Sequence, residues 1–146
     1  MAQWQIVLII KRQKVLQFLN ETVRPGVIDN PTIEVVQELA DIGKNFLGST
    51  QTSLISKYAF SMYPEIFFPY DSLVRNALKK RGWKIQDHDY CTYMKGFFQV
   101  KKELKTEIDK KCMIQPFYQN LTKLEKEIFI NRVVDKYLWL EGDNLR

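Results

Sequence analysis

The sequence lacks most of the short motifs that identify common enzymes. It contains no Walker phosphate-binding loop, no G-x-G-x-x-G, no G-x-S-x-G and no H-E-x-x-H. Its one histidine, His88, excludes any mechanism that needs two imidazoles. The motifs therefore leave open whether the chain is an enzyme, and a stand-alone activity on a small metabolite has no motif to support it.

Cysteine, proline and glycine are also scarce. The chain has two cysteines, Cys91 and Cys112, with 5 prolines and 6 glycines. A disulfide framework in a chain of this size needs more cysteines, so we expect both thiols to be reduced. No tract rich in Gly, Ser or Pro marks a linker. We therefore predict a single domain over residues 1–146.

Long apolar runs are absent as well. The run from Ile6 to Ile10 is far shorter than the roughly 20 apolar residues of a membrane span. Its positive charges, Lys11, Arg12 and Lys14, follow the run, whereas those of a secretory signal precede it. We therefore expect a cytoplasmic protein that does not associate with membranes.

What the chain does have is apolar side chains and positive charge. Hydrophobic residues make up 45% of its 146 residues, aromatic residues 13%, and the net charge is +5. This apolar content suffices for a sizeable core and argues against disorder. The basic balance favours an acidic partner, nucleic acid first and an anionic surface second.

Helical periodicity recurs along the whole chain and predicts an all-α fold, an irregular bundle of about six helices. Arg24-Pro25-Gly26 is expected to end the first helix. Asn30 is the expected N-cap of the second helix, Asp71 or Ser72 that of the fourth, and Thr122 with Glu125 forms a capping box for the sixth. The predicted ranges are near 2–22, from 30 to the Gly48 break, 52–63, from 71 to Gly82, 89–110 and 121–140.

Two strongly apolar segments need a burial partner. The start of the first helix, Trp4 to Ile10, is apolar nearly all round and is either buried or an interface; a β-strand over Ile6 to Ile10 is the competing interpretation. The loop over residues 63–70 carries Phe67 and Phe68 between two prolines. We expect this loop to fold back onto the core.

Residues 87–91 offer two alternatives to a plain turn. Asp87-His88-Asp89 alternates possible metal ligands, but a third or fourth ligand is not evident, so we predict a polar turn that caps the next helix. Cys91 lies at i, i+3 from His88, but no residue orients this pair as a nucleophile and base. We therefore predict no metal and no cofactor.

Basic residues cluster at the end of the fourth predicted helix. Lys79, Lys80, Arg81 and Lys84 flank Trp83. Positive side chains beside an exposed, stacking aromatic suit phosphate and base contacts. If the fourth and fifth helices are neighbours, the cluster would join a second group into one stripe; the alternative is a solvated face whose field is cancelled by Glu103, Glu107 and Asp109. The second group is Lys101, Lys102, Lys105, Lys110 and Lys111.

The most distinctive segment runs from Leu54 to Leu78. In this segment Ser56-Lys57 lies in an apolar helix that is followed by a proline. An aromatic residue, a second proline and one further residue then precede Asp71-Ser72 at the start of the next helix. Over roughly residues 48–78 this pattern resembles the helix-hairpin-helix DNA glycosylase superfamily, especially its oxoguanine branch. The end of the chain, 131–139, also resembles the closing helix of small bacterial proteins that share this pattern.

The resemblance implies a role for Asp71, because the matching aspartate of the family caps a helix and serves in glycosidic-bond cleavage. It does not extend to every feature. The hairpin that presents backbone amides to a phosphate has two glycines in the family, but residues 48–51 have only Gly48. The positions of the nucleophilic lysine of bifunctional members hold Thr52 and Ser53, so a lyase activity is not implied.

Two hypotheses follow from these patterns. The first is a nucleic-acid-binding module, a reduced relative of the DNA glycosylases with or without catalysis, in which Asp71 faces a flipped base. The amides of residues 48–51, Lys57 and the cluster over 79–84 would hold its phosphates. The second is a protein-interaction subunit or homo-oligomer that uses the apolar first helix and Phe67-Phe68.

Overall fold

The computed structural model describes the backbone of residues 3–143 and the side chains of residues 11–143. Within this range every regular element is a helix, which confirms the predicted all-α fold, and none of these helices is long and apolar enough to cross a membrane. The elements are α1 (Gln3–Phe18), a π-helical turn η1 (Leu19–Val23), α2 (Arg24–Asp29), α3 (Ile33–Leu47), α4 (Thr52–Met62), α5 (Ser72–Lys80), α6 (Tyr90–Met113), α7 (Pro116–Gln119) and α8 (Lys123–Asp143).

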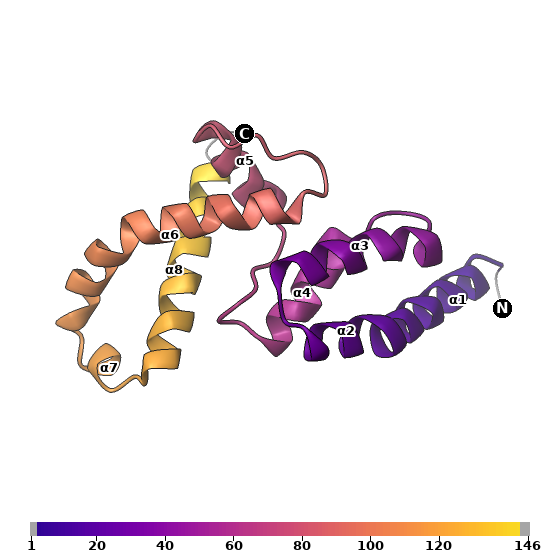
Figure 1. The fold of residues 1–146 in the computed structure, drawn as a ribbon, viewed down its shortest axis with the longest axis horizontal. Helices are drawn as coiled ribbons and strands as arrows, with labels where there is room; N and C mark the ends of the chain where they lie inside the picture. The colour runs from indigo at the N-terminus through magenta and orange to yellow at the C-terminus, as the bar shows by residue number, and fades with distance from the viewer. Residues whose placement is uncertain (1–2, 144–146) are drawn as a thin grey trace.

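The helices form two groups that share one core (Figure 1). The first group contains α1 to α4, and α3 packs on both α1 and α4. In the second group, α6 and α8 form a long hairpin closed by α7 at its tip, while α5 packs on α8 near the opposite end. Helix α3 also contacts α6, so the hairpin tip lies at one extreme of the molecule and the start of α1 at the other.

The first predicted helix does not end at Arg24-Pro25-Gly26. The helical path continues through the wider turn η1 into α2, and the Arg24 N–H bonds to the Leu19 carbonyl. Pro25 lies in the first turn of α2, where its missing N–H leaves no bond unmade. The strand alternative for Ile6 to Ile10 is wrong, because this segment belongs to α1.

Local capping chemistry determines the other helix starts. Asp71 caps α5, Asp89 caps α6, and the predicted capping box of α8 is present, with the Glu125 carboxylate accepting from the Thr122 N–H. The exception is α3. Its N-cap is Thr32 and not Asn30, because the Asn30 N–H bonds back to Gly26 and ends α2.

The aromatic loop folds back onto the core as predicted. Phe67 and Phe68 are both buried, with exposed fractions of 0% and 1%. Phe68 stacks on Phe97 of α6, with ring centroids 3.8 Å apart. The second hypothesis needs these two side chains on the surface, so this half of it is wrong. Its other half, the side chains of residues 4–10, lies outside the described residues.

Candidate functional site

The loop over residues 63–71 is held by buried tyrosines of α6. The Tyr90 hydroxyl donates to the Phe68 carbonyl at 2.8 Å and accepts from the Phe68 N–H at 3.2 Å. The Tyr93 hydroxyl donates to the Pro69 carbonyl at 2.7 Å. These bonds satisfy backbone groups that the apolar core would otherwise leave unpaired, so the loop has a fixed path.

Two further contacts hold this loop from α4 and α8. The Tyr70 N–H donates to the hydroxyl of the fully buried Ser56 at 2.8 Å, which gives this residue of the family-like motif a structural role. The amide of Asn131 on α8 donates to the Pro64 carbonyl at 3.4 Å. Preorganisation of this kind is what a site residue at the end of a loop requires.

Asp71 lies where this clamped loop enters α5. Its Oδ1 accepts from the Leu73 N–H at 2.8 Å and from the Val74 N–H at 3.4 Å, so the side chain is an N-cap. It is also partly exposed, so the cap does not seal it from solvent. The carboxylate therefore has a structural role and remains partly open to solvent.

A second carboxylate, Asp135 of α8, lies close enough to Asp71 for their charges to interact. Burial raises the pKa of the Asp135 carboxyl, and the negative charge of Asp71 raises it further. The cations of Arg132 and Lys136 oppose this rise. Two neighbouring carboxylates in different environments are a recurring arrangement for acid–base work on glycosidic bonds.

The raised pKa of Asp135 predicts a pH-dependent effect of Asp135→Asn. The folded state binds the Asp135 proton more tightly than the unfolded state, so this stabilisation is complete below the ordinary pKa of 3.8 and is lost as the pH rises through the raised value. The variant should therefore melt a few degrees above the wild type at neutral pH. The difference should vanish below pH 3.8, as calorimetry would measure. Glu38→Gln, at an exposed carboxylate, is the matched control; a rise for Asp135→Asn that persists in acid would contradict this assignment.

Cations on aromatic faces border the carboxylate pair. The Arg132 guanidinium lies 5.3 Å from the ring centroid of Phe60, a residue of α4. The Lys136 ammonium lies 4.0 Å from the centroid of Trp139. The same two cations also border a shallow groove of about 420 Å³ along α8. Its other lining residues are Phe129, Val133, Tyr137 and Leu140.

Asp135, Arg132 and Lys136 were not among the site residues predicted from the sequence. Their i, i+3 and i+4 spacing places them on adjoining parts of one helix surface, which is a weak signal for a site. Nothing local indicates that this part of α8 passes the start of α5.

The residues predicted to bind nucleic acid have unequal environments. Lys57, Lys79, Lys80 and Lys84 are exposed, and α5 ends at the third of them, Lys80. The Arg81 side chain instead bonds within the fold, to the Glu141 carboxylate at 2.9 Å and the Tyr137 hydroxyl at 3.0 Å. Trp83 was expected to be exposed, but it is partly buried against Gly96 of α6.

Ion pairs occupy much of the second lysine group. Lys101 is buried, with 8% of its surface exposed, and pairs with Glu127 of α8. Lys105 lies 3.6 Å from both Glu127 and Asp109, and Lys111 lies 2.8 Å from a Glu107 oxygen. These pairs favour the alternative of a charge-balanced helix face over one continuous basic stripe.

The turn over residues 48–51 uses two of its amides internally. The Gly48 N–H bonds to the Lys44 carbonyl with φ at +82°, a left-handed conformation that glycine adopts without strain. The Gln51 N–H bonds to the Ala40 carbonyl. The turn therefore ends α3 and starts α4, and offers fewer amides to a phosphate than the resemblance implies.

The turn over residues 87–89 is structural. Asp87 pairs with Arg75 at 2.6 Å, Asp89 caps α6, and the His88 Nδ1 lies 3.2 Å from the Thr52 hydroxyl. No group of three candidate metal ligands occurs among the described residues. Burial raises the pKa of the Cys91 thiol, which disfavours the nucleophilic thiolate.

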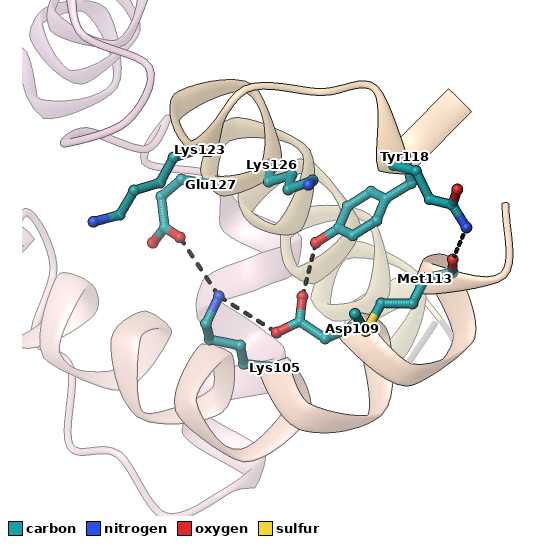
Figure 2. A pocket seen from close by; sticks show the side chains of 8 residues that line it. Lys105, Asp109, Met113, Tyr118, Lys123, Lys126 and Glu127 are labelled. Carbon is teal, nitrogen blue, oxygen red and sulfur yellow. Dashed lines mark hydrogen bonds and ion pairs between the residues drawn. The ribbon is translucent and has the colours of Figure 1, made fainter. Parts of the chain in front are cut away.

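A separate pocket of about 590 Å³ lies at the tip of the hairpin, between α6 and α8 with α7 across its end (Figure 2). Figure 2 shows the Lys105 ammonium between the carboxylates of Asp109 and Glu127, and the Tyr118 hydroxyl bonded to Asp109. Burial and this hydrogen bond raise the pKa of Tyr118 to about 12.

Comparison of the chain with models of protein families, with curated proteins and with solved structures gave no match.

Proposed function

We propose that this chain is a nucleic-acid-binding helical module, arranged like a reduced DNA glycosylase, in which Asp71 and Asp135 face an extruded nucleotide. The observation that carries the proposal is the charge interaction between Asp71 at the start of α5 and Asp135 on α8, to which Arg132 and Lys136 also contribute. The cations supply phosphate contacts, and Lys57, Lys79, Lys80 and Lys84 extend them.

The two carboxylates suit hydrolysis of a glycosidic bond. In such a reaction water adds to the sugar carbon, and the base leaves with a proton. The raised pKa of Asp135 favours the neutral form that donates a proton, while Asp71 carries the charge that stabilises a cationic sugar. The aromatic rings of Phe60 and Trp139 each have a cation over one face, and a base can stack beside these rings.

Charge reversal beside the pair tests the binding. In a salt-titrated gel shift on single- and double-stranded DNA, Arg132→Glu/Lys136→Glu should weaken binding about tenfold or more, because two phosphate contacts become repulsive, and should lower the slope of log affinity against log salt by about two. Lys79→Glu/Lys80→Glu should act in the same direction.

The matched control is Lys102→Glu/Lys110→Glu, which makes the same change in net charge at two exposed lysines of α6. It should keep affinity within about threefold of the wild type, because distant charges are screened at moderate salt. A wild type that does not shift DNA at low salt, or a control that loses as much as the test variant, would remove the proposal.

Asp71 variants separate its chemistry from its capping. Asp71→Asn keeps a good N-cap and should cost little stability, whereas Asp71→Ala should cost about 1 kcal/mol. Both should abolish base release from a duplex that carries an oxidised guanine, measured as alkali-labile strand breaks in single-turnover reactions. If Asp71→Asn releases the base as fast as the wild type, or the wild type releases none, Asp71 has only its capping role.

A further inference from the structure

The pocket at the hairpin tip is remote from the carboxylate pair. Its residues come from the second half of α6, from α7 and from the first turns of α8, whereas Asp135 lies in the second half of α8. Its volume of about 590 Å³ is within the usual range for small-molecule sites. Any ligand it holds therefore needs its own explanation.

The charges at the pocket do not balance. Asp109 and Glu127 are the two carboxylates that line it, and both are engaged: Asp109 by Tyr118 and Lys105, Glu127 by Lys101 and Lys105. The remaining lining cations are Lys123 and Lys126, and neither has a carboxylate within ion-pair distance among the described residues. An anionic group is what this rim lacks.

The walls are apolar next to these cations. Met113 lines the pocket with 64% of its surface exposed, so its apolar side chain is open to a ligand. The buried Tyr118 ring borders the pocket, and the Lys126 ammonium lies 5.5 Å from its centroid. Figure 2 shows Met113 on the same side of the pocket as Tyr118. A flexible thioether beside an aromatic face adapts to varied apolar shapes.

We propose that this pocket binds a small amphipathic organic anion, with its phosphate or carboxylate at the Lys126 ammonium, where Lys123 adds to the positive field, and its apolar body against Met113. The ion-pair network beneath, from Lys101 to Asp109, fixes the floor. The apolar body distinguishes this ligand from a free phosphate, which the cations alone would attract.

Methyl NMR of the full chain labelled at its methionine methyl groups tests the proposal. The probes are naphthyl phosphate, decyl phosphate, decanoate and inorganic phosphate. The Met113 signal should move saturably with at least one probe that has an apolar body, while that of Met94, which is fully buried in the core, stays fixed. Naphthyl against decyl phosphate distinguishes a planar from a chain-like body, and decyl phosphate against decanoate distinguishes the two anionic heads.

Lys123→Ala/Lys126→Ala should weaken that binding about tenfold or more, and the exposed pair Lys102→Ala/Lys110→Ala on α6 should leave it unchanged. An unchanged Met94 signal reports that each variant is folded. The proposal is overturned if inorganic phosphate alone reproduces the Met113 shift, if no probe saturates it, or if Lys123→Ala/Lys126→Ala binds like the wild type. A Met113 signal that moves with protein concentration before any probe is added would assign the tip to a second copy of the chain, and would also overturn it.

Discussion

Phe68→Ala is expected to lower the free energy of unfolding by about 3–5 kcal/mol, because it removes a large ring from the centre of the core. Phe68 is 1% exposed and stacks on Phe97. It also meets the edge of Phe98, with centroids 6.2 Å apart. Urea unfolding followed by circular dichroism measures the change.

Phe46→Ala is the matched control for that substitution. Phe46 also stacks on a core ring, that of Phe18 at 5.2 Å, but 57% of its surface is exposed. Its removal should cost about 1 kcal/mol or less, since little apolar area returns to water. If the two variants differ by less than about 1 kcal/mol, the loop is not the centre of the core that this structure places there.

The same core explains how the candidate site is built. The loop runs from α4 to α5, and Tyr90 and Tyr93 bond its backbone at Phe68 and Pro69. The end of that path is Asp71, so packing at Phe68 and the position of the carboxylate belong to one cooperative unit. Phe68→Ala should therefore also reduce any base release that depends on Asp71.

Local signals were sufficient to predict most helices and several of their starts. Asp71, Asp89 and the pair Thr122 and Glu125 act on amides two or three residues away, so their capping roles can be inferred from the sequence. The prediction that the first helix ends near Pro25 is wrong because it too used only local signals. A proline usually ends a helix, but it is tolerated in a first turn, and nothing local shows that η1 starts a new one.

The candidate site could be predicted only in part, because its two carboxylates come from distant parts of the chain. Asp71 has a recognisable position after a proline loop. Asp135 resembles any polar residue on a helix until the crossing of α5 and α8 places it beside Asp71. The burial of Lys101 could not be predicted for the same reason. Its charge is compensated by Glu127, which lies 26 positions further along the chain on α8.

That crossing of α5 and α8 is the basis of the second large effect, expected for Gly142→Val. A Cβ at Gly142 would lie 2.0 Å from the Leu73 carbonyl oxygen and 2.6 Å from its carbon, both backbone atoms of α5. Backbone cannot rotate away as a side chain can, so the helices must separate. We expect a loss of about 3 kcal/mol or more in the free energy of unfolding.

Leu140→Val provides the control, because it introduces the same branched side chain at a position that is 49% exposed on the same helix. It should cost no more than about 1 kcal/mol. Gly142→Val forces the two helices apart at Leu73, and the Leu73 N–H is one of the two that Asp71 caps. The substitution should therefore also move the Asp71 and Asp135 carboxylates away from each other. If Gly142→Val unfolds at the wild-type urea concentration, α8 does not approach α5 as closely as the carboxylate pair requires, and the proposed site loses its geometric basis.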